Sequence, residues 1–142
     1  MPLTFAAQIA DWGERTKENQ SLVLRESVQD VMEQAQKSQQ SMVRGATGVK
    51  YGAIPVDTGF LQNTIASDLN GSGDFVVDAA GTDFELTIAG MESGDTAHFA
   101  WTAVYARAVN YGHGTYPGAH WVEAAAAQWR SIVAKNAKRF RP

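Results

Sequence analysis

The sequence predicts an α+β domain in which a long N-terminal helix and a C-terminal helix pack on a small antiparallel β-sheet. Two observations predict this class. Apolar residues recur every three or four positions near both ends of the chain, whereas in the middle they alternate with polar residues. The first spacing places side chains on one face of a helix, and the second places them on one face of a strand. With 142 residues the chain has the length of one ordinary domain, so we expect a single domain over residues 1–142.

The N-terminal helix is expected to start near Thr4 and to end near Gly45. Its apolar stripe consists of Phe5, Ile9, Trp12, Leu24, Val28, Val31, Ala35 and Met42. Gly13 and the polar residues 14–21 weaken the middle of this helix, because a glycine inside a helix costs about 1 kcal/mol relative to alanine. The expectation is therefore a long amphipathic helix that can bend near Gly13.

Three or four short strands are expected next. Residues 83–89 alternate polar and apolar side chains, and Phe75 with Val77 and Phe99 with Trp101 begin similar runs. Turns are expected at Asn70-Gly71, at Gly81 and at Gly94-Asp95. Two segments, Arg44–Pro55 and Leu69–Asp83, show no regular period and are predicted to be long loops.

The C-terminal helix is expected to begin near Ala119. Its stripe contains Trp121, Val122, Ala125, Trp129, Ile132, Val133 and Asn136. Basic residues gather in its last turns, where they suit the negative end of the helix dipole. The positions of Trp12, Trp121 and Trp129 on apolar helix faces indicate core packing rather than stacking on nucleic-acid bases.

Charge is distributed unevenly along the chain. Residues 51–106 contain eight acidic residues and no Lys or Arg, whereas residues 107–142 contain six basic residues and the single acid Glu123. This asymmetry is typical of a basic arm for nucleic acid, or of a surface whose acidic side meets the basic side of a neighbouring copy. A solvated charge distribution without a partner is the third interpretation.

The composition excludes several kinds of site. No cysteine is present, so disulfides and thiolate-metal sites are excluded, and the three histidines lack the i, i+4 spacing of a helical zinc site. The glycine-rich run 111–118 lacks the lysine of a phosphate-binding loop. We therefore expect no cofactor and no metal. No apolar run is long enough to cross a bilayer, and the N-terminus does not resemble a secretion signal, so we expect no membrane contact and synthesis in the cytoplasm.

The tripeptide Asp57-Thr58-Gly59 raises one enzymatic alternative, because aspartic proteases place this tripeptide at the catalytic carboxylate. Such an enzyme needs two carboxylates that share a proton, so this chain would have to act as a dimer using Asp57. Pro55 before the tripeptide, the bulky Phe60 after it and the two long helices argue against this class. The favoured interpretation is a turn in which Asp57 or Thr58 accepts backbone hydrogen bonds.

Three motifs follow the N-terminal helix in order. The first is Pro55-Val56-Asp57-Thr58-Gly59-Phe60-Leu61 with Thr64-Ile65, the second contains Tyr105, Ala106, Val109, Tyr111 and Gly112, and the third is Pro117-Gly118-Ala119-His120-Trp121. This order resembles the head-tail joining proteins of long-tailed double-stranded DNA bacteriophages, also called neck, tail-completion or minor tail proteins. The chain departs from the family pattern at three places: Asn110 stands where Glu is usual, His113-Gly114 are inserted, and Trp121 replaces Phe.

The resemblance implies a virion component without enzymatic activity, made in the cytoplasm of the bacterial host. It implies a ring, with a hexamer favoured over a dodecamer, between the head-closure or connector protein and the tail-tube or tail-terminator protein. A tail terminator that caps the tube is the alternative within the same class. Genome DNA is expected to pass through the lumen without tight binding. Lys50 and Tyr51, a cation and an aromatic residue in the first long loop, are the candidate assembly loop.

Overall fold

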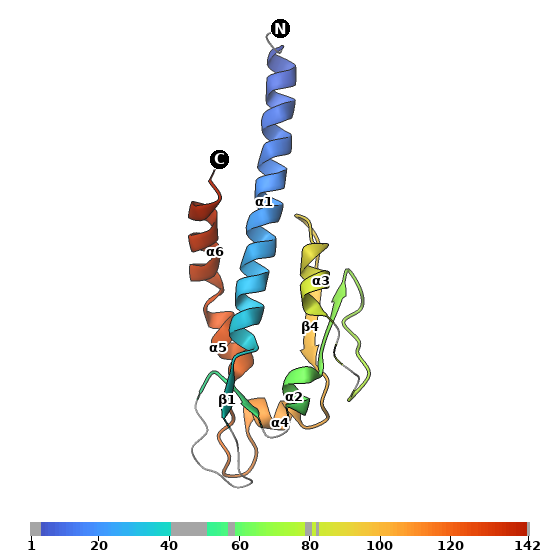
Figure 1. Cartoon of the computed structure of the whole chain (residues 1–142), viewed down its shortest axis with the longest axis vertical. Coiled ribbons are helices and arrows are strands. Elements are labelled where there is room, and N and C mark those ends of the chain that lie inside the picture. The colour runs from blue at the N-terminus through green and yellow to red at the C-terminus, as the bar shows by residue number, and fades with distance from the viewer. Residues whose placement is uncertain (1–3, 41–50, 57–58, 79–80, 82, 142) are drawn as a thin grey trace.

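The computed structural model describes residues 4–40, 51–56, 59–78, 81 and 83–141, and it confirms the predicted α+β class (Figure 1). The elements, in chain order, are α1 (Phe5–Ala35), β1 (Ser38–Gln40), β2 (Ile54–Val56), α2 (Phe60–Asn63), β3 (Ile65–Leu69), α3 (Phe84–Ala89), β4 (Ala97–Trp101), α4 (Ala106–Tyr111), α5 (Trp121–Ala127) and α6 (Trp129–Arg139). Helix α1 is the central axis of the molecule. Helices α5 and α6 lie on one side of it, and α3 with the pair β3–β4 lies on the other (Figure 1).

Helix α1 starts as predicted but ends ten residues before Gly45. The Thr4 hydroxyl accepts the Ala7 N–H at 3.1 Å, which caps the start, and the helix runs through Gly13 without a break. Helix α1 ends at Ala35 because the residues after it make tertiary contacts that a helical backbone would not allow. Strand β1 pairs in parallel with β2, and the Gln36 side-chain amide donates to the Gln62 carbonyl at 3.1 Å. Met42, the last expected helix residue, lies outside the described part of the chain.

Strands β3 and β4 form the antiparallel pair, with Ile65 opposite Trp101 and Leu69 opposite Ala97. Strand β4 begins near the predicted Phe99, whereas β3 was not predicted. The strand expected to begin at Phe75 and Val77 does not form, because both residues lie in a segment without regular structure. That part of the long-loop prediction is confirmed for the described residues 70–78. In the other predicted loop, β2 occupies residues 54–56, so the segment 44–55 ends in a strand.

Residues 84–89 form helix α3 and not the predicted strand. The Asp83 side chain accepts the Glu85 N–H at 3.1 Å and caps the first turn. On a helix, Phe84 and Ile88 share one face, and this face packs toward the core, while Leu86 is left 71% exposed. Phe84, Leu86 and Ile88 produce the alternation in the sequence, but only Phe84 and Ile88 pack toward the core.

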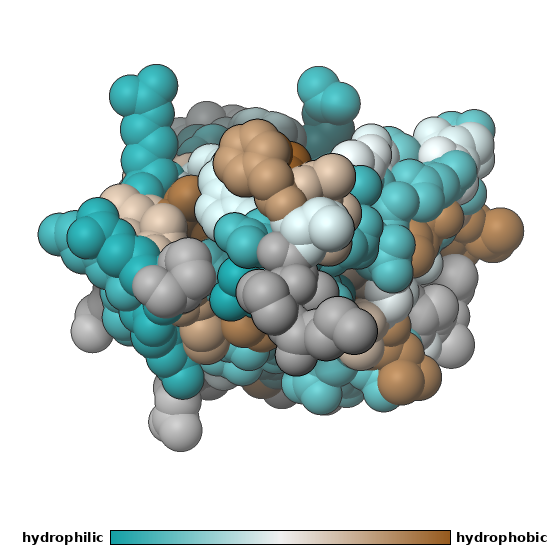
Figure 2. All heavy atoms as spheres, turned by 90° about the horizontal axis from the view of Figure 1, so that it is seen from above, coloured by the Kyte–Doolittle hydropathy of each residue, from teal (hydrophilic) through white to brown (hydrophobic). Residues whose placement is uncertain are grey.

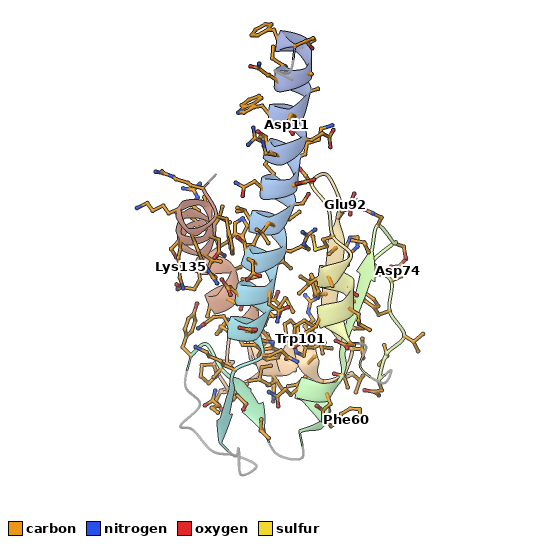
Figure 3. The ribbon with its side chains drawn as sticks, turned by 45° about the horizontal axis from the view of Figure 1, so that its top comes forward. Asp11, Phe60, Asp74, Glu92, Trp101 and Lys135 are labelled. Atoms are coloured by element: carbon orange, nitrogen blue, oxygen red, sulfur yellow. The ribbon has the colours of Figure 1, made fainter. Side chains whose placement is uncertain are left out.

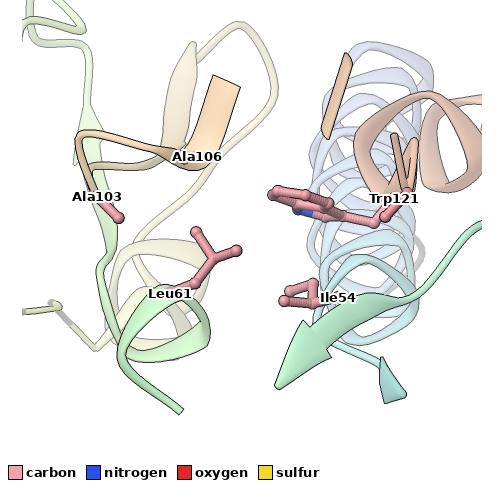
Figure 4. Packing of buried hydrophobic residues seen from close by; sticks show 6 residues of the cluster. Ile54, Leu61, Ala103, Ala106 and Trp121 are labelled. Atoms are coloured by element: carbon pink, nitrogen blue, oxygen red, sulfur yellow. The ribbon is translucent and has the colours of Figure 1, made fainter. Parts of the chain in front are cut away.

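The core consists of two clusters of buried side chains. The upper one, between α1, α3 and the antiparallel pair, contains Val28, Met32, Ile65, Ile88 and Met91. The lower one contains Ile54, Leu61, Ala103, Ala106, Ala119 and Trp121 (Figure 4). Trp101 packs against both clusters, and its ring meets the Trp121 ring edge-on at 5.7 Å between centroids. Trp101 thus joins the sheet to the C-terminal helices.

The C-terminal helix begins two residues after the predicted start and is divided at Gln128 into α5 and α6. Asn136, which sequence periodicity placed on the apolar stripe, is fully buried against α1. Its side-chain amide donates to the Ser27 hydroxyl at 3.2 Å and to the Asp30 carboxylate at 3.0 Å. These two bonds fix α6 against α1 at one position along the helix.

The prediction that three tryptophans pack in the core is correct only for Trp121, which is 1% exposed. Trp12 is 64% exposed and Trp129 is 37% exposed. The reason for Trp12 is visible in Figure 1, where the N-terminal half of α1 projects beyond the rest of the molecule. An apolar stripe at helical spacing shows that a face is apolar, but not that the same chain covers it.

Candidate functional site

The three sequence motifs meet at the end of the molecule opposite the N-terminus, around β2, α2, α4 and the start of α5 (Figure 1). We call this region the motif junction. Leu61 of the first motif, Ala106 of the second and Trp121 of the third belong to the same buried cluster, and Val109 packs against it. Segments about 60 residues apart in the sequence therefore share one core.

The first motif serves as a turn into a short helix. Pro55 is buried within β2, and Gly59 precedes α2 with φ of 83°, a left-handed conformation that glycine adopts without strain. Leu61, 5% exposed, then points into the lower core. Asp57, Thr58 and Lys50 lie outside the described residues, so their predicted roles stay predictions.

The second motif forms α4 and the tight turn after it. Tyr105 precedes the helix, its ring centroid 6.2 Å from that of Phe60 in the first motif. Gly112 and Gly118 allow two backbone segments to meet: a Cβ atom would stand 2.4 Å from the Tyr116 carbonyl at Gly112, and 2.5 Å from the Asn110 carbonyl at Gly118. Both positions also have positive φ. Glycine is therefore required at these two positions by space as well as by conformation.

Asn110, one of the departures from the family pattern, is the polar centre of the junction. It is 3% exposed, and its side-chain amide donates to the two carboxylate oxygens of Glu123 at 2.9 and 3.1 Å. Its side-chain oxygen accepts the Val122 N–H at 3.4 Å, and its backbone carbonyl accepts the His120 N–H at 3.0 Å. The side chain thus ties α4 to the first turn of α5. A Glu at this position would face the carboxylate of Glu123.

An aromatic patch covers the outside of the junction. The Tyr51 ring stacks on the His120 ring with 5.7 Å between centroids, Tyr111 meets His120 edge-on at 6.5 Å, and the Arg107 guanidinium lies 5.8 Å from the Tyr111 centroid. Tyr51 is 68% and Tyr111 57% exposed. Aromatic and arginine side chains in this arrangement are typical of protein–protein contacts. The structure therefore brings together the candidate assembly residue Tyr51 and the second motif, which sequence reasoning had treated separately.

The predicted charge asymmetry becomes two opposite sides of the molecule. The acidic side, on α3 and the loops beside it, carries the exposed residues Asp74, Asp78, Asp83, Glu85 and Glu92. The basic side, on α6 and just after it, carries Arg130, Lys135, Lys138, Arg139 and Arg141, all exposed. Figure 3 shows Asp74 and Glu92 on one side of α1 and Lys135 on the other. Acidic and basic residues that are separated along the sequence are therefore also separated in space.

One histidine–carboxylate pair resembles part of a catalytic arrangement. His98 Nδ1 lies 2.8 Å from the Asp68 carboxylate, whose other oxygen accepts the Gly73 N–H at 2.9 Å. Desolvation opposes ionisation of Asp68, but the hydrogen bonds from His98 and Gly73 outweigh it, so the pKa of Asp68 lies below its usual value. The pair fastens the loop after β3 to β4. His120 is hydrogen-bonded as well, through its Nε2 atom to the Pro117 carbonyl at 2.8 Å.

Other classes of site are not found in the described part of the chain. Over residues 4–40, 51–56, 59–78, 81 and 83–141, no group of three His, Asp or Glu side chains is placed to hold a metal ion. In the same residues, no helix combines the length and the apolar character needed to cross a bilayer.

No family model, curated protein or solved structure matches this chain. The likeness to head-tail joining proteins therefore depends on the short motifs themselves.

Proposed function

We propose that this chain is a structural subunit of a bacteriophage neck, which forms a ring at the head-tail junction and links the head connector to the tail tube. The observation that carries the proposal is the placement of acidic and basic residues on opposite sides of α1. A head-to-tail contact joins one surface of a subunit to a different surface of the next, and such contacts close into rings when the rotation fits. Opposite charges on the two surfaces steer this encounter and set its direction.

The motif junction supports a structural role for the motifs that carry the resemblance. Their apolar residues, Trp121 included, pack in the lower core, their glycines allow tight turns, and Tyr111 and His120 form a surface patch with Tyr51. A surface of this composition fits contact with another protein better than it fits binding of a small substrate. The neighbouring proteins would be the head-closure or connector protein on one face of the ring and the tail tube or tail terminator on the other.

A hexamer matches the sixfold symmetry of a tail tube, and a dodecamer is the alternative. An acidic lumen would repel the phosphates of the passing genome and let the duplex slide. We therefore expect no tight duplex binding at about 150 mM salt. Submicromolar binding there would indicate that the basic side lines the lumen.

The proposal is tested by measuring the mass of the purified protein at low and high salt, combined with electron microscopy of the low-salt sample. We expect rings of six subunits that dissociate as salt rises, because screening weakens contacts between exposed charges. A protein that forms no ring at any salt or concentration, alone or with connector and tail-tube proteins, would overturn the proposal. Binding to the connector as well as to the tube separates a neck subunit from a tail terminator, which needs the tube alone. A casein-cleavage assay tests the distant alternative, a dimeric aspartic protease that uses Asp57.

A further inference from the structure

The N-terminal half of α1 presents an exposed apolar stripe that consists of Phe5, Ile9 and Trp12. These side chains are 78%, 53% and 64% exposed. Figure 2, which looks onto the end that carries the N-terminus, shows hydrophobic side chains exposed among hydrophilic ones. Three large apolar residues at 4- and 3-residue spacing form one continuous patch, and patches of this kind mark contact surfaces.

A second apolar feature continues the same face of α1 toward the body of the molecule. It is a groove of about 340 Å³ between α1 and α6, lined by Asn19, Gln20, Val23, Leu24, Ser27, Trp129, Val133 and Ala137. At 100° per residue, the stripe and the groove positions Gln20, Val23 and Ser27 fall within an arc of about 80° on α1. The exposed stripe is thus an extension of the face that α6 covers lower down.

Among the described residues, nothing outside α1 covers this stripe, so Phe5, Ile9 and Trp12 stay exposed. The C-terminal helix α6 ends below the N-terminal half of α1 (Figure 1). The stripe is therefore open to another molecule.

Spacing identifies that molecule as a second copy. Along the chain the stripe is spaced 4 and then 3 residues, while Gln20, Val23 and Ser27 are spaced 3 and then 4. In an antiparallel pair of α1 helices, Ile9 therefore faces Val23 and Trp12 faces Gln20, while Phe5 reaches the level of Ser27, which α6 covers. Each helix repeats these contacts on the other. Each patch is about 10 Å long, so stripe and groove have the same length.

The centre of such a pair is compatible with burial. Thr16 would face its own copy on the two-fold axis, and its hydroxyl already donates to the Trp12 carbonyl at 2.8 Å, so burial leaves the Thr16 hydroxyl paired. The charged residues of this region, Asp11, Glu14, Arg15, Lys17 and Glu18, all lie outside the arc at 100° per residue. The contact is therefore apolar at its ends and uncharged at its centre.

We propose that the protein associates as a two-fold pair in which the exposed stripe of each α1 occupies the α1–α6 groove of the other copy. Phe5 and Trp12 alone bury roughly 300 Å² per copy, and with the groove surface that they cover, the pair buries on the order of 1,200 Å², the lower end of specific interfaces. A two-fold contact closes at two subunits. It leaves the acidic side and the outer face of α6 uncovered, so it does not depend on the proposed ring.

Cysteine cross-linking tests the pairing without background, because the chain has no cysteine. Thr16→Cys should oxidise to a covalent dimer, whereas Glu14→Cys, on the opposite face of α1, should not. Ile9→Cys and Val23→Cys should each fail to cross-link alone, because equivalent positions are about 21 Å apart in the antiparallel register. An equimolar mixture of the two should cross-link. Self-linking of Ile9→Cys, or no link in the mixture, would overturn this register.

Sedimentation provides a second, independent measurement. Ile9→Glu should raise the dissociation constant of the pair at least tenfold, with unchanged thermal melting of the separated subunits, since Ile9 has no role in the core. Ala10→Glu, an exposed neighbour off the arc, is the matched control and should leave pairing unchanged. A wild-type protein that is monomeric at about 100 µM would overturn the proposed pair. Ring formation measured on the same variants separates failure of the pair from failure of the proposed ring.

Discussion

At the scale of residues, Asn110 shows how a buried polar side chain is balanced by its neighbour. Buried polar groups are stable when they are hydrogen-bonded, and Asn110 donates to Glu123 while it also accepts the Val122 N–H. An amide can donate to a carboxylate, whereas an ionised carboxylate at the same position cannot. An asparagine at position 110 therefore has a local physical reason.

We predict that Asn110→Asp lowers the free energy of unfolding by about 2 kcal/mol at pH 7, because it places a second carboxylate within about 3 Å of Glu123. One of the two acids would then have a raised pKa. An acid whose pKa is raised in the folded state gains stability as pH falls, so the loss should shrink between about pH 7 and pH 4. Urea unfolding of the variant and the wild type at several pH values measures this. A loss that is the same at all pH values would contradict it.

A second prediction concerns Asp95 in the turn before β4. Its carboxylate accepts the Glu92 N–H at 2.8 Å and the Asn70 side-chain amide at 3.1 Å, and these bonds, in this order, lower its pKa. A lowered pKa contributes stability above the unfolded value near 4, and this contribution is lost as pH falls through the folded value. Wild type should therefore be more stable than Asp95→Asn at pH 7 and lose that advantage below about pH 4. Equal stability of the two proteins at pH 7 would show that these bonds contribute nothing.

At the scale of elements, the spacing of apolar residues predicted that an element is present better than it predicted where the element ends or whether it is a helix or a strand. Both terminal helices and the strand that contains Phe99 were found from spacing alone. The Phe84–Ala89 segment was misassigned because its alternation suits a strand, although Asp83 before it and Gly90 after it are the cap residues of a helix. Those two residues were the signal that could have corrected the prediction.

Other elements could not be read from local sequence. Strand β3 is recognisable only through its partner β4, and α1 ends at Ala35 because β1 pairs with a strand that begins 16 residues after Ser38. Exposure of Trp12 depends on how far α6 reaches along α1, which no pattern within α1 reveals. At the motif junction, spacing identified the residues, but their meeting in one core required the fold.

Docking of α6 on α1 leads to a prediction at this scale. Asn136→Ala should lower the free energy of unfolding by about 2 kcal/mol, because it removes the bonds to the buried Ser27 hydroxyl and to the half-buried Asp30 carboxylate. Ser131→Ala, at an exposed position on the same helix, should change stability by less than about 0.5 kcal/mol. Hydrogen exchange should become faster in α6 before it does in α5, which the lower core holds through Trp121. Equal effects of the two variants would show that the polar contact does not hold α6.

At the scale of the whole molecule, four surfaces of this chain face different directions. The acidic and basic sides lie on opposite flanks of α1, the aromatic patch lies at one end, and the exposed stripe lies at the other. Flank contacts would extend an assembly around an axis, the aromatic patch would join it to other components, and the exposed stripe is the proposed contact with a second copy. A subunit in a ring between two larger structures needs contacts in both directions.

The flank contact can be tested by exchanging its charges. Arg130→Glu with Lys135→Glu and Lys138→Glu makes the basic side acidic, and Asp74→Lys with Glu85→Lys and Glu92→Lys makes the acidic side basic, at exposed positions where folding should be unaffected. Each triple variant alone would bring like charges together at every contact, so we expect no ring from either. Mixed in equal amounts, the two should alternate around the axis and form a ring with an even number of subunits, six or twelve. This rescue should weaken as salt rises toward about 1 M, where the screening length falls to roughly 3 Å. Native mass spectrometry of the separate and mixed samples provides the measurement. Rings from either variant alone would show that opposite charge on the flanks does not direct assembly, and a mixture that stays unassembled while the wild type forms rings would place the subunit contact on another surface.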